Sequence, residues 1–183
     1  MTSLLVNHIL QTEKWTSPEL FETKNRIYTF LNPVSYLIAL ENKSLFKQFD
    51  GIFADGSLLV SAIRLVYGKR VTRRSFDMTS LAPELLNYLM ESRKTLYIVA
   101  SGQEQVECSV RIFQEQYPKL RIAGFRNGYF SSDAEMNKEA SHIVELNPDF
   151  LIVGMGALMQ EKFLLKVKKM GYHCLLYTSD AAD

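Results

Sequence analysis

One carboxylate stands where it could do chemistry. Asp55 follows a short apolar run and precedes Gly56. A carboxylate at the end of a strand is placed to take a proton from a hydroxyl, as a general base does. The competing interpretation is that Asp55 caps a helix that begins near Ser57. Asp55 is therefore the candidate catalytic residue, with the cap as its alternative.

A second candidate is the glycine loop Gly154-Met155-Gly156, which precedes an expected helix. Backbone N–H groups at such a helix start can approach a diphosphate, helped by the helix dipole. The alternative is a tight turn without a ligand. The loop is not a dinucleotide fingerprint, because Met159 stands where the third glycine is required and no acidic residue closes a later strand at the right distance.

Further polar residues could contact a substrate. Arg73 belongs to a basic cluster and could pair with a phosphate in a bidentate manner, or the cluster could be a solvated turn. Tyr129 could stack on a base or belong to the core. Glu161 follows Gln160 at a helix start, where its charge suits the dipole whether or not it binds a ligand.

The elements that must position these residues alternate between strands and helices. Short apolar runs predict strands at residues 26–31, 51–55, 95–100, 120–125, 149–153 and 172–177. Helical spacing, caps and stops predict helices after Asn32-Pro33 and at residues 57–67, 79–91, 103–116, 133–146 and 160–170. This alternation predicts an α/β fold, a Rossmann-like, mostly parallel sheet with helices on both faces. The segment around Trp15 is expected to be a lid or packing arm.

Ligands of an open parallel sheet bind beyond the carboxyl ends of its strands. The loops at that edge, together with Arg73, define the expected substrate-binding set: Thr29, Asn32, Gly56, Arg73, Ser101, Gly102, Tyr129, Gly154, Gly156, Gln160 and Glu161.

Composition excludes several other classes of protein. The 183 residues are 47% hydrophobic with a formal net charge of +1, which argues against a disordered chain and against nucleic acid as the main partner. Two cysteines give no disulfide framework, and neither metal-ligand spacing nor an Asp-x-Asp pair is found. No run approaches the ~20 apolar residues of a membrane span. We expect a cytoplasmic protein that needs no metal or cofactor.

The C-terminal residues LLYTSDAAD resemble the read-through of a sequencing adaptor, although a genuine polar tail is the alternative. We therefore expect a single domain over residues 1–174, truncated at its C-terminus, followed by a non-native tail at 175–183.

Taken in order, these loops resemble those of the WecG/TagA/CpsF family of bacterial glycosyltransferases. The resemblance covers about residues 26–170. The segments that carry it are Thr29 with Asn32-Pro33, Phe53-Ala54-Asp55-Gly56, Arg73 with Ser75, Ser101-Gly102, Tyr117-Pro118, Gly124, Gly128-Tyr129-Phe130, Pro148-Asp149, Val153-Gly154-Met155-Gly156 and Gln160-Glu161.

The resemblance implies an inverting, metal-independent transfer of an N-acetylmannosamine-type sugar. The donor would be a UDP-sugar and the acceptor a lipid-linked prenyl diphosphate, in the synthesis of teichoic acid, enterobacterial antigen or capsule. By this analogy Asp55 is the base, Thr29 and Asn32 lie near the sugar, and the segment from Gly154 to Glu161 helps to build the nucleotide side. Family members continue into a C-terminal appendage thought to bind the membrane. The full-length protein would thus lie at the inner face of the cell membrane, with contact only through that segment.

Two departures from the family pattern bear on donor choice. Phe76 stands in the region where the family has a glycine before its aspartate, so the alignment of Asp77 is open. Leu158 replaces the usual proline before Gln160-Glu161. The alternatives to a glycosyltransferase are a Rossmann-like nucleotide-binding enzyme of another class and a regulatory nucleotide-binding domain. The sequence leaves a homo-oligomer open.

Overall fold

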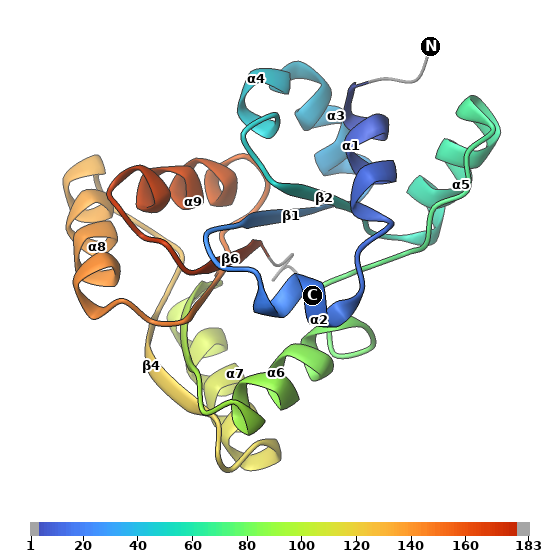
Figure 1. Cartoon of the computed structure of the whole chain (residues 1–183). Helices are drawn as coiled ribbons and strands as arrows, with labels where there is room; N and C mark the ends of the chain where they lie inside the picture. Colours follow the sequence, from blue (N-terminus) through green and yellow to red (C-terminus); the bar gives the residue numbers. More distant parts are fainter. Residues whose placement is uncertain (1–3, 179–183) are drawn as a thin grey trace.

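The protein is built around one six-stranded sheet (Figure 1). The computed structural model describes residues 4–178, apart from the side chains of Pro18 and Leu176. The strands are β1 (Ile27–Leu31), β2 (Gly51–Ala54), β3 (Thr95–Ala100), β4 (Arg121–Arg126), β5 (Phe150–Gly154) and β6 (Leu175–Thr178). They lie in the order β2-β1-β6-β5-β3-β4, and the strand pairs are parallel. All carboxyl ends therefore meet at one edge of the sheet, as the sequence predicted.

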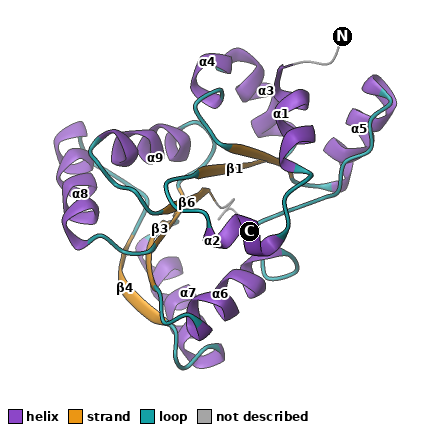
Figure 2. Ribbon diagram, in the orientation of Figure 1, coloured by secondary structure: helices purple, strands orange, loops and turns teal. Residues whose placement is uncertain are grey.

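Helices cover both faces of this sheet (Figure 2). They are α1 (Leu4–Thr12), α2 (Ser17–Glu22), α3 (Pro33–Glu41), α4 (Lys43–Phe46), α5 (Ser57–Tyr67), α6 (Leu81–Glu91), α7 (Gln103–Gln116), α8 (Asp133–Leu146) and α9 (Met159–Lys169). One core joins the sheet to α1, α3, α4, α5, α8 and α9. A second core joins its other face to α2, α6 and α7. The expected α/β architecture is confirmed.

Local signals in the sequence account for several helix boundaries. Asn32 caps α3 with its side-chain oxygen, which accepts hydrogen bonds from the amides of Val34 and Ser35, and Pro33 takes the first helical position. Gly68 follows the last residue of α5 and has a φ of 64°. Glycine adopts this left-handed conformation at little cost, which explains why the helix ends there. Helices α5, α7 and α8 have the bounds that the sequence predicted.

The N-terminal segment differs from the expectation. Helices α1 and α2 occupy most of residues 4–22, where the sequence predicted a lid or packing arm and no helix. Trp15, between them, packs edge-on against Tyr28 and under the guanidinium of Arg26. The prediction that Trp15 serves packing is therefore confirmed, but the two helices were missed. Within the described residues, none of the helices has the length and apolarity needed to traverse a bilayer.

Strand β6 lies between β1 and β5, in the middle of the sheet. It comprises residues 175–178, the first part of the segment that the sequence assigned to a non-native tail. The Tyr177 hydroxyl donates to the carbonyl of Leu20, and Thr178 is buried against β1. The folded unit thus includes Thr178. Residues 179–183 lie outside the described residues, and the origin of the tail stays a prediction.

Gly51 offers a test of how closely the sheet packs under Trp15. A Cβ at this position would lie 2.7 Å from Cδ1 of the buried Tyr28 ring and 3.0 Å from Cζ3 of Trp15. We predict that Gly51→Ala lowers the free energy of unfolding by about 1–3 kcal/mol, because the buried Tyr28 ring and the partly buried Trp15 ring must shift. Guanidinium unfolding followed by fluorescence measures this effect.

Gly102→Ala is the matched control. The Cβ there meets only the end of the flexible, exposed Gln105 side chain, so the loss should stay below about 1 kcal/mol. An equal decrease in the free energy of unfolding for Gly51→Ala and Gly102→Ala would contradict the prediction.

Candidate functional site

Three loops at the carboxyl edge of the sheet are bound directly to one another. The amide of Ser101, after β3, donates to the carbonyl of Gly154 at the end of β5. The amide of Gly128, after β4, donates to the carbonyl of Ser101. Both N···O distances are 2.9 Å. These bonds fix the floor of a pocket that the sequence pattern could place only at an edge.

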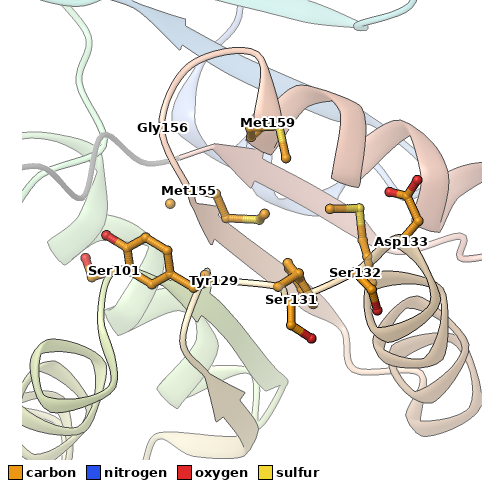
Figure 3. A pocket seen from close by; sticks show the side chains of 12 residues that line it. Ser101, Tyr129, Ser131, Ser132, Asp133, Met155, Gly156 and Met159 are labelled. Atoms are coloured by element: carbon orange, nitrogen blue, oxygen red, sulfur yellow. The ribbon is translucent and has the colours of Figure 1, made fainter.

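The pocket has a volume of about 610 Å³, within the usual range for small-molecule sites. Its lining includes four predicted residues: Ser101, Tyr129, Gly154 and Gly156. Figure 3 shows Ser101 and Tyr129 on one side of the pocket and Ser132 and Asp133 on the opposite side. The lining also includes the hydroxyl of Ser131 and the side chains of Met155 and Met159, as Figure 3 shows.

The electrostatic character of this pocket is unusual for a phosphate site. Its lining residues include no lysine, arginine or histidine, and Asp133 is their one carboxylate. Tyr129 is an aromatic surface that is 74% exposed. An aromatic face, methionines, hydroxyls and one carboxylate suit an uncharged base and its ribose better than they suit a diphosphate.

A buried carboxylate joins this pocket to β1. Glu161, in the first turn of α9, is fully buried. Its carboxylate accepts hydrogen bonds from the Thr29 hydroxyl at 2.8 Å and the Leu158 amide at 2.6 Å. The Gln160 side-chain amide adds a third donor at 3.2 Å, while the Gln160 carbonyl oxygen is buried without a hydrogen-bond partner. Three predicted residues, Thr29, Gln160 and Glu161, thus form one cluster.

The pKa of Glu161 is raised, chiefly because burial disfavours the charged carboxylate. The hydrogen bonds from Thr29, Gln160 and Leu158 act in the opposite direction but do not cancel this effect. Leu158 itself has a φ of 74°, a conformation that costs a non-glycine residue roughly 1–2 kcal/mol. The bond from its amide to Glu161 helps to hold that conformation.

Asp55 and Arg73 form the third group. The Asp55 amide donates to the carbonyl of Leu31, which holds the end of β2 beside β1. The Arg74 amide donates to Ala54, so the segment after α5 returns to the same strand end. Arg73 Nε then lies 3.6 Å from Asp55 Oδ1, and the Asp55 side chain is only 18% exposed. Gly56, not Asp55, holds the N-cap position of α5.

Arg73 is shared between two carboxylates. Its Nη2 atom lies 2.8 Å from Asp77 Oδ2. Burial raises the pKa of Asp77, but hydrogen bonds from Ser75 and Thr79 and the charge of Arg73 outweigh this and lower it to about 2. Asp77 therefore stays ionised and anchors Arg73 near Asp55.

The other predicted residues frame these groups. Asn32 is the cap of α3 beside the end of β1, and Gly56 lies close enough that a Cβ there would be 3.9 Å from Pro33 Cδ. Gly102 is the N-cap residue of α7 and does not line the pocket.

Sequence reasoning missed several residues of the site. Ser131, Ser132 and Asp133 reach the pocket from the start of α8. Their Ser-Ser-Asp pattern signals a helix cap, and Ser132 does accept the Glu135 amide, but it does not signal a pocket wall. Arg74 was not missed, since it belongs to the basic cluster that the sequence singled out, and it has a buried guanidinium nitrogen, Nη1, without a hydrogen-bond partner. Among the described residues no cluster of three His, Cys, Asp or Glu side chains is arranged to hold a metal.

Comparison with known proteins shows the family to which the chain belongs. The profile of the family described as "Glycosyl transferase WecG/TagA/CpsF family" matches residues 9–178. The chain belongs to this family. The match begins within α1 and reaches the end of β6, beyond the part of the chain on which the sequence resemblance rested.

Characterised relatives are similar over much of the chain. A UDP-Gal:alpha-D-GlcNAc-diphosphoundecaprenol beta-1,4-galactosyltransferase of Shigella boydii is 28% identical over 173 residues, which cover 94% of this chain and 68% of that protein. An N-acetylglucosaminyldiphosphoundecaprenol N-acetyl-beta-D-mannosaminyltransferase of Bacillus subtilis is 23% identical over 142 residues, which cover 75% of this chain and 53% of that protein. A protein of the same description in Staphylococcus aureus is 26% identical over 121 residues, covering 66% and 46%. The chain thus spans about two thirds of the first relative and about half of the others.

One departure from the WecG/TagA/CpsF pattern has a structural consequence. A proline at position 158, which the sequence resemblance led us to expect, would require a φ near −65°, whereas Leu158 adopts 74°. The loop between β5 and α9 therefore takes a conformation here that proline cannot adopt.

Glu161 yields a prediction about the dependence of stability on pH. Because its folded-state pKa is raised above the ordinary value of 4.5, the ionised side chain costs stability, and this cost grows as the pH rises through 4.5 toward the folded-state pKa. Glu161→Gln cannot titrate. The free energy of unfolding of the wild type relative to Glu161→Gln should therefore fall as the pH rises from about 4 to 7.5. Urea unfolding of both proteins across this range measures the difference.

Glu135→Gln is the control for this measurement. Hydrogen bonds from Ser131 and Arg126 lower the pKa of Glu135 to about 2, so its contribution to stability is lost only as the pH falls below about 4.5. The free energy of unfolding of the wild type relative to Glu135→Gln should therefore not change with pH above about 4.5. A flat or rising difference for Glu161→Gln would contradict the prediction.

Proposed function

We propose that this chain transfers a hexose from a UDP-sugar to the hydroxyl of a lipid-linked sugar diphosphate. The names of the relatives support this proposal. Each of them names a diphosphoundecaprenol acceptor, and the first names a UDP-sugar donor. The observation that carries it is the position of Asp55, at the carboxyl edge of the sheet with the cation of Arg73 3.6 Å away.

In this proposal the pocket beside Tyr129 holds the uridine. The uracil ring stacks on the Tyr129 ring, and the carboxylate of Asp133 accepts a hydrogen bond from a ribose hydroxyl. The absence of basic side chains from the pocket lining favours the uncharged part of the donor there. The diphosphate then extends toward the Gly154–Gly156 loop and the N-terminus of α9, where backbone amides and the helix dipole favour an anion.

Asp55 acts as the general base in a single displacement. The acceptor oxygen forms a bond to the anomeric carbon as the bond from that carbon to the UDP oxygen breaks, and the hydroxyl proton passes to the Asp55 carboxylate. Attack opposite the leaving group inverts the anomeric centre. Both types of relative have a beta linkage in their names, as inversion of an alpha-linked donor would give.

Charge that develops on the departing diphosphate is stabilised by the backbone amides and by Arg73, without a metal ion. Asn32 follows the end of β1, beside the strand end that holds Asp55, where the transferred sugar would sit, whereas Thr29 is buried within β1 and bonded to Glu161. We propose an N-acetylmannosamine-type donor. Galactose is the second candidate, because the relative that matches 94% of the chain is named for UDP-Gal.

An acceptor of this kind places the enzyme at the inner face of the cell membrane. The alternatives of another nucleotide-dependent enzyme or a regulatory domain predict no UDP release in the presence of a lipid-linked acceptor. Incubation with UDP-N-acetylmannosamine or UDP-galactose and a prenyl-diphosphate-linked N-acetylglucosamine distinguishes them.

Asp55→Asn tests the mechanism directly. The amide cannot accept the proton, so turnover should fall by about 10²–10⁴-fold, the usual contribution of a general base. The affinity for UDP should change by less than about threefold, because the substitution does not touch the nucleotide pocket. A coupled assay of UDP release and titration calorimetry with UDP measure the two quantities.

Glu104→Gln is the matched control, since Glu104 is an exposed carboxylate in the first turn of α7 and lies outside the site. It should leave both quantities unchanged. An Asp55→Asn variant with wild-type turnover would remove Asp55 from the mechanism.

A further inference from the structure

Helices α3 and α5 leave an apolar surface uncovered beside the site. Among the described side chains, six large apolar ones are more than 60% exposed, and five of them lie on these two helices: Val34, Leu37, Leu58, Leu65 and Val66. The sixth is Tyr129, which the nucleotide pocket explains. Leu65, at 88%, is the most exposed. Figure 1 shows α5 standing away from the body of the molecule. We call this surface the α3–α5 face.

A groove runs along the α3–α5 face between the two helices. Its volume is about 360 Å³, and its lining residues carry no charge: Pro33, Tyr36, Leu37, Leu58, Leu59, Ala62, Ile63, Val66 and Tyr67. Ile63 and Leu59 point into the core, so the apolar character of α5 continues around to its outer side. A helix that is apolar beyond its core-facing stripe needs a second apolar partner.

The segment that contains α5 has charge of one sign, whereas α3 ends with the exposed acidic residue Glu41. Residues 56–76 contain five basic residues and no acidic one: Arg64, Lys69, Arg70, Arg73 and Arg74. The rest of the chain carries sixteen basic residues against twenty acidic ones. Arg64, Lys69 and Arg70 are exposed. The acidic groups that contact this segment are Glu13, which accepts the Thr72 amide, and the carboxylates of Asp55 and Asp77 that face Arg73.

The α3–α5 face also adjoins the candidate base. Helix α3 begins directly after Asn32 and α5 directly after Gly56, so both start at the strand ends that hold Asp55. Pro33 and Leu58, at these helix starts, line the groove. The groove therefore begins next to the catalytic carboxylate and runs away from it.

We propose that the α3–α5 face docks on the surface of an anionic phospholipid membrane. Leu58, Leu65 and Val66 enter the boundary between headgroups and acyl chains, and Arg64, Lys69 and Arg70 meet the headgroup phosphates. The sequence led us to expect membrane contact only from a segment beyond this chain, whereas this surface provides contact within it. The inference deepens the proposed function, since it brings Asp55 to the membrane that holds a lipid-linked acceptor.

The charges favour a membrane over a second copy of the chain. In a twofold dimer the same patch meets itself, so the basic residues around the α3–α5 face would face one another. An anionic bilayer instead complements them. Both the apolar and the charged part of the surface then have a partner.

Sedimentation with lipid vesicles tests the proposal. The wild-type chain should bind vesicles of phosphatidylcholine with roughly 30% phosphatidylglycerol, bind poorly to phosphatidylcholine alone, and be released by salt at about 0.5 M. Leu65→Ser with Val66→Ser, and separately Arg64→Gln with Lys69→Gln, should each weaken binding to the anionic vesicles by about tenfold or more. All four positions are exposed, so circular dichroism should show an unchanged fold.

Ile112→Ser with Arg111→Gln is the matched control, because it removes one exposed apolar and one exposed basic side chain from α7. Its vesicle binding should equal that of the wild type. UDP affinity, and UDP release with a detergent-solubilised acceptor, should stay unchanged in every variant. This readout separates the two hypotheses, since a loss of vesicle binding alone leaves the proposed function intact.

Three outcomes would overturn the membrane proposal. The first is equal binding of anionic vesicles by the wild type and both double variants, or no binding by any of these proteins. The second is a wild-type dimer that Leu65→Ser with Val66→Ser converts to a monomer, measured by light scattering, because the face would then join two copies. The third is binding only to vesicles that contain a polyprenyl diphosphate, because the groove would then hold the prenyl chain rather than contact the bilayer.

Discussion

The buried carboxylate of Glu161 is the constraint on which the arrangement of the site depends. A carboxylate removed from water must be met by donors, and these come from different parts of the fold: the hydroxyl of Thr29 on β1 and the amide of Leu158 in the loop before α9. The loop that forms the pocket wall is thereby fixed to β1, which leads to Asn32 and pairs with β2, the strand that ends just before Asp55. The pocket and the candidate base are connected through this carboxylate and the pairing of β1 with β2.

The parallel sheet determines what this edge can offer a substrate. Six strands that point the same way bring uncharged loops and charged loops to one side, but at different places along it. The loops after β3, β4 and β5 form a pocket without basic side chains, whereas the end of β2 holds Asp55, Arg73 and Asp77. A donor with an uncharged nucleoside and a charged diphosphate matches that division. In the proposed mechanism the nucleotide-binding residues and the candidate base are therefore separated in space while they share one sheet.

The sequence predicted the elements better than their assembly. Short apolar runs and capping residues such as Asn32 and Gly68 are local signals, so most strands and helices were found from them. Strand order is not local, and the placement of β6 between β1 and β5 depends on packing between segments far apart in the chain. Helices α1 and α2 were missed because they are short and depend on packing against the sheet, α1 in one core and α2 in the other.

The same distinction applies to the site. Asp55, Gly154 and Gly156 lie at or just after the carboxyl ends of strands, so the rule of the carboxyl edge was enough to select them. Ser131 and Asp133 lie beyond a turn, and their place in the pocket follows from the bond between Gly128 and Ser101, which no sequence pattern records. The pattern predicted Thr29 and Glu161 as separate contacts to a ligand, whereas they bind each other.

The outer side of α5 completes the physical argument. Burial of Leu59 and Ile63 is enough to attach this helix to the sheet, so Leu58, Leu65 and Val66 add nothing to that packing. Exposed apolar side chains favour aggregation, and five basic residues in one segment repel one another. Neither feature stabilises the folded chain in water. Both become favourable together only against a surface that is apolar inside and anionic outside, and the strand end that carries Asp55 lies beside it.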